Sequence, residues 1–315
     1  STKRAHRLLI QAAVDSGERG AASFRAWRES VRLTDVDYPS QKMLSAVGHH
    51  LGHDEVSQQV LKVARFTWLR SQLLLHAGLR AAAALQAEGI PTAWIKGGAV
   101  LAWTSTEISK RPMDDVDLLV PLEEVTEATE CLNRAGFFSL ADRELLECPE
   151  LITRNVHAIA FRDSQGAEVD LHWQLLKGDR DEVSEHALWS RSKTATLLGQ
   201  KIVAISVEDL LVQVIATNRE GSDAYWVVDA LRLIEDNKVD FAEVLAIARE
   251  RRLGRMSSIA LAIISSFRPG GIPARHRAPA IITRFVDRLH SAVFGNIVMR
   301  NVSELVTLGV PRSFH

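Results

Sequence analysis

The sequence has few cysteines and no long apolar segment. Cys131 and Cys148 are the only cysteines in 315 residues, too few for a disulfide framework and without the spacing of a metal site. No apolar run approaches the roughly 18 residues that a membrane-spanning helix requires. No basic segment followed by an apolar one suggests a secretory signal at Ser1. These absences exclude a disulfide scaffold and predict a cytoplasmic protein, with no membrane partner, whose thiols are free and partly buried.

The sequence also lacks an excess of charge of either sign. Lysine and arginine total 38 against 39 acidic residues, so the net charge of −1 indicates no polyanionic partner for the chain as a whole. Arginines nevertheless concentrate between Arg249 and Arg288, where Glu250 and Asp287 are the only acids. This Arg-rich region is suited to binding nucleic acid or another anionic acceptor. Solvated helix and loop positions would give the same composition.

The composition is that of a globular protein large enough for more than one core. Apolar residues make up 46% of the chain and charged residues 24%, and we find no internal repeat or low-complexity segment. We expect an α+β fold in three parts. These are a helical N-terminal region over residues 1–60, a small mixed-sheet core over residues 61–180, and a helical C-terminal domain over residues 181–315.

The expected elements follow from hydrophobic spacing and from the positions of glycine and proline. Apolar residues recur at helical spacing over residues 60–88, and Gly89 then ends the helix. The next elements should be a strand at 92–95, a helix from Ala99 to about Ile108, a strand at 116–120, and an amphipathic helix from Pro121 to Gly136 with Leu122 on its apolar side. A hairpin with its turn at 163–166 follows, and after about residue 180 the pattern is nearly all helical.

Two aspartates one residue apart are the most informative feature of the chain. Asp115 and Asp117 lie at the start of an expected strand, where residues i and i+2 share a face. Asp170, in the second strand of the hairpin, is a third acid. Carboxylates that lie close repel each other unless a cation sits between them, and Mg2+ is a hard ion that prefers oxygen ligands. The three aspartates therefore predict a metal-dependent enzyme that handles phosphates.

A two-metal arrangement would use these acids in different ways. Two ions about 3.5–4 Å apart could share Asp115 and Asp117. Asp170 could complete the coordination of the ion that activates an acceptor hydroxyl.

Gly97 and Gly98 predict a phosphate site near the acids. A strand that ends at this pair and opens into a helix presents backbone N–H groups to a phosphate, and glycine allows close approach. Arg111 is placed to contact a phosphate oxygen through its guanidinium, and Lys96 is a further candidate. Each has a structural alternative: a turn for the glycines, a capped loop for Arg111, and a Lys96 side chain that points away. For His172, which shares a strand face with Asp170, we favour a structural role.

Three segments of the sequence share a family resemblance. They are Ile95-Lys-Gly-Gly-Ala-Val-Leu101, Arg111-Pro-Met-Asp-Asp-Val-Asp-Leu-Leu-Val120 and Val169-Asp-Leu-His-Trp173. Together they resemble the nucleotidyltransferase superfamily of DNA polymerase beta, and most of all its uncharacterised bacterial branch. The superfamily pattern is a glycine pair, an Asp-x-Asp on the next strand and a third acid on a later strand. The likeness extends from about Ala64 to Leu253.

The resemblance implies a role for each matched residue. Gly97 and Gly98 look like the triphosphate loop, Asp115 and Asp117 like the paired metal ligands, and Asp170 like the third acid. Residues 61–180 would then be the catalytic core of a bacterial nucleotidyltransferase. Such an enzyme would use an NTP such as ATP, with two Mg2+ ions as cofactors and Mn2+ as an alternative.

The sequence does not identify the acceptor. A small molecule, a peptide, a protein side chain and a tRNA end all fit the pattern. Two other functions fit it as well. One is a non-catalytic nucleotide-binding module that regulates or partners another protein, and the other is a toxin–antitoxin component.

Overall fold

The protein is described by a computed structural model that covers residues 2–15, 17–31, 36, 38–50, 55–141, 156–178, 182–217, 225–268 and 270–273. The described residues form two compact units. Unit 1 comprises those within 1–66, 109–111 and 211–315, and unit 2 those within 67–108 and 112–210. Cys148 and the Arg-rich region beyond residue 273 lie outside the described residues. Cys131 is free and buried, as expected.

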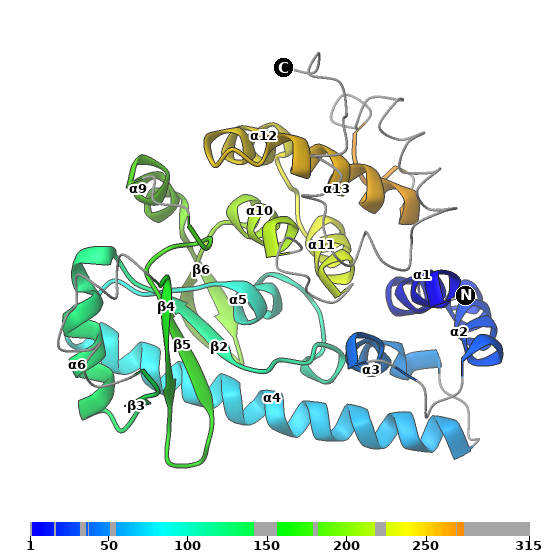
Figure 1. Cartoon of the computed structure of the whole chain (residues 1–315), viewed down its shortest axis with the longest axis horizontal. Coiled ribbons are helices and arrows are strands. Elements are labelled where there is room, and N and C mark those ends of the chain that lie inside the picture. Colours follow the sequence, from blue (N-terminus) through cyan, green and yellow to red (C-terminus); the bar gives the residue numbers. More distant parts are fainter. Residues whose placement is uncertain are drawn as a thin grey trace. The chain divides into compact units, whose positions relative to one another are not determined.

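Unit 2 is built on a seven-stranded mixed sheet with the strand order β3-β4-β5-β2-β1-β7-β6 (Figure 1). The strands are β1 (Ala93–Trp94), β2 (Val116–Leu119), β3 (Phe138–Ser139), β4 (Ala158–Arg162), β5 (Glu168–His172), β6 (Lys193–Leu197) and β7 (Gln200–Ala204). Strand β2 pairs in parallel with β5, and β1 in parallel with β7. The other neighbouring pairs are antiparallel. The expected α+β class with a mixed sheet is confirmed.

The central strand β2 is buried along its whole length. Val116, Leu118 and Leu119 are fully buried, which explains why this stretch is almost continuously apolar in sequence. Asp117 is the exception, a carboxylate only 3% exposed among these apolar residues. Burying a charge in such a position costs free energy unless the charge has partners. A buried aspartate in an apolar strand is therefore a candidate functional residue.

The helices of unit 2 are the C-terminal part of α4 (Glu55–Ala87), α5 (Lys96–Trp103), α6 (Val125–Arg134), which follows the short turn η4 (Leu122–Glu124), and α9 (Glu182–Arg191). Helix α4 is divided between the units at Phe66. Its end is set by Gly89, whose φ of 79° allows the Gly89 and Ile90 N–H groups to donate to Gln86 and Leu85 at 3.0 Å. Gly136 ends α6 in the same way, through Gly136 and Phe137. Both helix ends are confirmed.

Trp94 fixes the packing of two helices against the sheet. A Cβ atom at Gly78 of α4 would lie 2.7 Å from Cη2 of Trp94, and one at Gly98 of α5 would lie 2.4 Å from Cε3 of the same ring. The indole is 1% exposed. Glycine at both positions lets the two helices approach this ring, which places the first turn of α5 beside β1.

Three expectations about the elements of unit 2 were wrong. Helix α5 covers Lys96–Trp103 instead of running from Ala99 to about Ile108: the glycine pair lies inside its first turn, and Ile108 belongs to the separate turn η3 (Ile108–Lys110). Leu122 is 47% exposed, because it belongs to the turn η4 that precedes the apolar face of α6. The region after residue 180 contains the β6–β7 hairpin, which extends the sheet.

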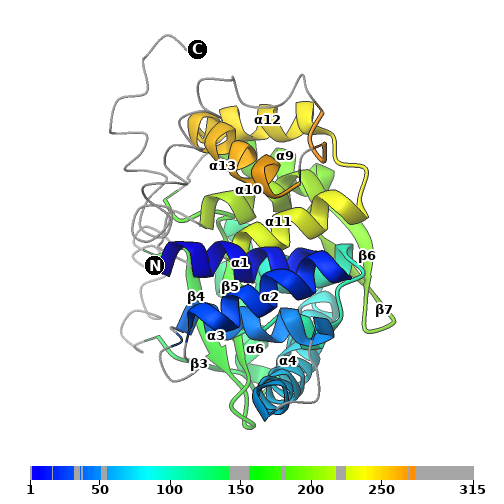
Figure 2. The same cartoon turned by 90° about the vertical axis from the view of Figure 1, so that its right-hand side faces the viewer.

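Unit 1 is helical, with α1 (Thr2–Val14), α2 (Glu18–Ser30), α3 (Tyr38–Leu44), η2 (Ser45–His50), α11 (Tyr225–Asp236), α12 (Phe241–Glu250) and α13 (Gly254–Phe267). The turn η3 (Ile108–Lys110) and α10 (Val207–Thr217) are divided between the units. Helix α1 packs against α2, α3 and α11, so elements from the two ends of the chain lie side by side (Figure 2). Arg268 strengthens this packing, since it forms ion pairs at 2.5 Å with Asp15 and with Glu235.

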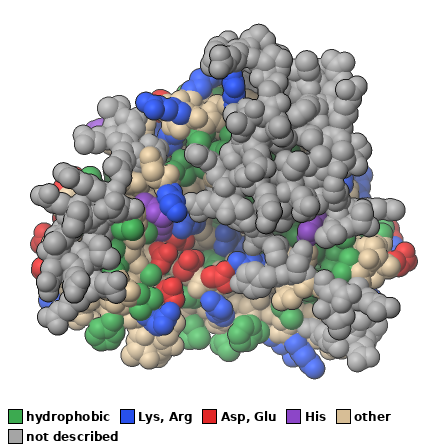
Figure 3. Space-filling model, in the orientation of Figure 1, with side chains coloured by type: hydrophobic (Ala, Val, Ile, Leu, Met, Phe, Trp, Pro, Cys, Tyr) green, Lys and Arg blue, Asp and Glu red, His purple; other side chains and the backbone are tan. Residues whose placement is uncertain are grey.

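No helix among the described residues is long and apolar enough to cross a membrane. Charged side chains are unevenly distributed on the face drawn in Figure 3, where acidic groups lie together with basic groups and a histidine beside them.

Candidate active site

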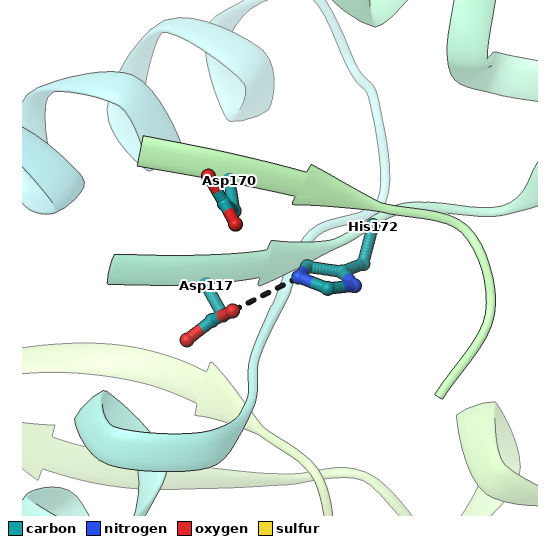
Figure 4. A group of neighbouring side chains, drawn as sticks. All are labelled: Asp117, Asp170 and His172. Atoms are coloured by element: carbon teal, nitrogen blue, oxygen red, sulfur yellow. Dashed lines mark hydrogen bonds and ion pairs between the residues drawn. The ribbon is translucent and has the colours of Figure 1, made fainter. Parts of the chain in front are cut away.

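The pairing of β2 with β5 brings two of the predicted acids together. Asp117 and Asp170 are Cα partners in this parallel pair, and Leu119 is the partner of His172. Figure 4 shows Asp117, Asp170 and His172 from these two strands, with the imidazole of His172 turned toward Asp117. The alternation of β5 gives Asp170 and His172 the same face, as the sequence predicted. Residues 53 positions apart thus meet because two strands share one register.

Two side-chain nitrogen atoms contact the same carboxylate oxygen of Asp117. Oδ1 lies 2.9 Å from Nε2 of His172 and is also contacted by Nζ of Lys96. The two nitrogens lie 3.3 Å apart. Asp117 and His172 are almost completely buried, whereas the Lys96 side chain is about one-third exposed. The buried carboxylate is therefore compensated by a cation that reaches the surface.

The same cluster offers oxygen and nitrogen ligands for a metal ion. Asp117, Asp170 and His172 each provide one ligand atom, and these atoms all lie within 4.8 Å of one another. Oδ1 of Asp170 is buried and has no hydrogen-bond partner among the described residues. An unsatisfied buried carboxylate oxygen beside a second carboxylate suits a cation, so these residues fit a divalent metal.

The charges in the cluster shift the pKa values of its three carboxyl groups in different directions. Burial alone would raise the pKa of Asp117, but Lys96 and His172 outweigh it and lower the pKa to about 2. Burial, followed by the charges of Asp117 and Asp170, raises the pKa of Asp115 to about 7. Burial and the charge of Asp117 also raise the pKa of Asp170. Concentrated negative charge in a partly buried position is typical of functional sites.

The ammonium of Lys96 remains protonated in this environment. Burial lowers its pKa, but the carboxylates of Asp117, Asp115 and Asp170 more than offset that effect and raise it. These interactions place Asp115 close to the other acids. Asp115 directly precedes β2, and it is not one of the three residues in the metal-ligand cluster.

The predicted phosphate-binding residues lie at the start of α5. Lys96 is the first residue of that helix and has a φ of 45°, in the left-handed region that non-glycine residues rarely adopt. Gly97 and Gly98 follow in the first turn, where backbone N–H groups lack partners within a helix. The close approach of Trp94 is a separate reason for glycine at position 98.

Arg111 is not part of this cluster and belongs to unit 1. Its guanidinium binds Asp229 in a bidentate manner, with Nε and Nη2 at 3.2 and 2.8 Å from the two carboxylate oxygens, and it lies 5.9 Å from the centre of the Tyr225 ring. No local pattern in the sequence indicated Asp229 as its partner.

The described part of the Arg-rich region is not uniformly exposed. Arg251 is 6% exposed, and Arg268 is engaged by Asp15 and Glu235. Arg249 and Arg252 are exposed. Binding of nucleic acid by this region stays a prediction.

His172 is the one member of the metal-ligand cluster for which the sequence favoured a structural role. It is 1% exposed, as a structural residue would be, yet its Nε2 contacts the central carboxylate. The indication available in the sequence was its position two residues after Asp170 on the same strand face.

Comparison with known proteins supports a family assignment. A family model described as "Uncharacterised nucleotidyltransferase" matches residues 41–269. No match to a curated protein was found.

Two solved structures are similar at low identity. One is the antibiotic-resistance factor ANT(2'')-Ia, with 12% identity, a TM-score of 0.39, and coverage of 58% of this chain and 92% of that one. The other is an antigenic nucleotidyltransferase-like protein from Paracoccidioides brasiliensis, with 18% identity, a TM-score of 0.37, and coverage of 64% and 88%. These TM-scores are low, so the assignment depends on the family model.

Proposed function

This chain belongs to the family described as uncharacterised nucleotidyltransferases, and from that membership we propose a specific reaction for it. The protein transfers a nucleoside monophosphate from an NTP to an acceptor hydroxyl and releases pyrophosphate. The transfer depends on divalent metal ions held by the acid cluster, with two Mg2+ ions as the expected set and Mn2+ as an alternative.

The observation that supports this proposal most strongly is the pairing of Asp117 with Asp170. Two carboxylates at partner positions on adjacent parallel strands form a rigid pair, and a buried Asp170 oxygen has no hydrogen-bond partner among the described residues. Rigid strands hold ligands more precisely than loops do. Asp115, whose pKa of about 7 reflects burial and the nearby acids, would complete the set of three.

Each site residue has a defined part in the proposed reaction. Asp115 and Asp117 would hold the metal ions jointly, and Asp170 would hold the ion nearest the acceptor. Divalent cations bound there would lower the pKa of the acceptor hydroxyl and neutralise charge on the leaving pyrophosphate. His172 would keep the carboxylate of Asp117 in a fixed orientation through the 2.9 Å contact.

The residues that would bind the NTP lie at the start of α5. The backbone N–H groups of Gly97 and Gly98 would face the triphosphate, since the positive end of a helix dipole favours anions. Lys96 would contribute a positive charge at the same place. Arg111 would have to leave Asp229 before it could contact a phosphate, so we expect it to contribute less to NTP affinity than Lys96, Gly97 and Gly98.

A pair of neighbouring variants tests the proposal. Asp117→Asn removes a metal ligand, whereas Asp114→Asn changes an acid whose side chain is 44% exposed and lies 3.8 Å from Arg70. Pyrophosphate release from NTPs in the presence of Mg2+ and a cell extract as the source of acceptor should fall strongly in Asp117→Asn. The loss should exceed the roughly 10–100-fold that removal of an outer partner of a metal ligand costs.

The control should stay near the wild-type rate, because the Asp114 side chain is partly exposed and pairs with Arg70 at the surface. Equal rates for wild type and Asp117→Asn would contradict the proposed function. NTP binding without turnover in the wild-type protein would favour a non-catalytic nucleotide-binding module instead.

A further inference from the structure

Lys96 and a divalent cation would need the same carboxylate group, that of Asp117. Nζ of Lys96 contacts Oδ1 of Asp117, and so does Nε2 of His172 at 2.9 Å. The Asp117 carboxylate belongs to the cluster whose ligand atoms lie within 4.8 Å of one another. Two cations that close together repel each other strongly in a partly buried site. Binding of a metal at Asp117 therefore competes with the lysine.

The two partners of this ion pair differ in their freedom to move. The Asp117 side chain is 4% exposed and comes from the middle of the sheet, whereas the Lys96 side chain is 32% exposed. Lysine also has a flexible stem of four carbons and a pKa that keeps it charged. When the contact breaks, the lysine is the partner that can leave.

The position of Lys96 in the chain determines where its ammonium can go. Lys96 is the first residue of α5 and directly precedes Gly97, in the turn that would face the triphosphate. Its φ of 45° is a strained conformation for a lysine. Its side chain contacts Asp117 from this same turn, so one residue can reach both the acid cluster and a phosphate bound at the helix start.

We propose that Lys96 is a displaceable resident cation that makes metal binding depend on the nucleotide. With metal alone, the lysine competes for Asp117 and keeps metal affinity low. When metal and NTP arrive together, the ammonium moves to the triphosphate, so the cost of breaking its contact with Asp117 is offset by a new anionic partner. This device rests on the proposed function, since it assumes that an NTP binds at the start of α5.

The proposal predicts opposite effects of one substitution on two binding reactions. In Lys96→Met, Mn2+ added without nucleotide should bind about tenfold tighter than to wild type, because the competing charge is gone. Binding of each of the four NTPs with Mg2+ should weaken about tenfold, because the triphosphate loses a cation. Free Mn2+ can be measured by electron paramagnetic resonance, and NTP binding by equilibrium dialysis with labelled NTPs.

Two further variants serve as controls. Lys96→Arg keeps the charge and should keep Mn2+ binding weak. Lys201→Met removes an exposed lysine from β7 and should change neither reaction. Thermal unfolding shows whether Lys96→Met folds, and Lys96→Gln, whose amide can still donate to Asp117, replaces it if it does not.

The outcome separates this inference from the proposed function. Unchanged or weaker Mn2+ binding in the folded neutral variant would overturn the inference, even if nucleotidyl transfer in the wild type depends on Asp117. Tighter Mn2+ binding together with weaker NTP binding would support it. A third outcome is tighter Mn2+ binding in the variant while the wild-type protein binds no NTP. It would support competition between Lys96 and the metal at Asp117, but it would overturn the dependence on nucleotide. It would also count against the proposed function.

Discussion

Asp117 combines deep burial with full ionisation. It lies on a strand whose other residues are apolar, and Lys96 and His172 lower its pKa to about 2. An unpaired charge there would be strongly destabilising. These contacts explain how the chain tolerates a carboxylate inside the sheet. Oδ1 of the neighbouring Asp170 has no such partner among the described residues.

The ionised Asp170 carboxylate should therefore lower the free energy of unfolding, although we expect it to be needed for nucleotidyl transfer. Burial and the charge of Asp117 raise its pKa, so its ionised form is disfavoured in the folded protein. Asp170→Asn should increase the free energy of unfolding of the metal-free protein near pH 8, yet reduce nucleotidyl transfer. The free energy of unfolding in urea, measured with a chelator present, checks the first part.

The pH dependence provides the internal control for Asp170→Asn. A carboxyl group with a raised pKa stabilises the folded state fully below its ordinary pKa of 3.8, and this contribution is lost as pH rises through the folded-state value. Asparagine resembles the protonated form, so the gain should disappear near pH 4. A variant that is less stable than wild type near pH 8 would show that Asp170 has a structural role.

At the scale of elements, the position of α5 depends on one glycine. A Cβ atom at Gly98 would lie 2.4 Å from the Trp94 ring, closer than any real contact, so Gly98→Ala must displace the helix or the indole. We expect a loss of about 1–3 kcal/mol in the free energy of unfolding. Transfer activity should also fall, because α5 contains Lys96 and Gly97.

Gly48→Ala is the matched control, because a Cβ atom there meets nothing within 4 Å. Its effect on the free energy of unfolding should stay within about 0.5 kcal/mol. Urea denaturation of both variants makes the comparison. A Gly98→Ala protein as stable as Gly48→Ala would contradict the packing at Trp94.

Local patterns made some elements predictable from the sequence. Alternation along β5 placed Asp170 and His172 on one face, and the positive-φ residue Gly89 ended α4 as expected. The β6–β7 hairpin was missed because its exposed positions are polar and only two residues per strand are buried. Such a short alternation resembles a loop in sequence.

The contacts that define the site are long-range and could not be deduced from local patterns. Strand register brings His172 to one oxygen of Asp117, and the position of α5 brings Lys96 to the same oxygen; hydrophobic periodicity encodes neither. The family resemblance identified the acids and the glycines. It did not indicate that a lysine contacts the central carboxylate.

At the scale of the whole molecule, the chain joins a mixed-sheet unit that contains the acid cluster to a second, helical unit. Family membership supports nucleotide transfer in general. The acids of β2 and β5 are the part of the chain from which we infer a metal-dependent reaction, and the acceptor is the component still to be identified.

The most direct test of nucleotidyl transfer compares NTPs labelled at the α-phosphate with NTPs labelled at the γ-phosphate. Each is incubated with the protein, Mg2+ and an extract, beside the Asp115→Asn/Asp117→Asn variant. We predict that the α-label enters an acceptor, that the γ-label appears in pyrophosphate, and that the variant does neither. Entry of the γ-label into an acceptor, or equal α-labelling by the variant, would contradict the account.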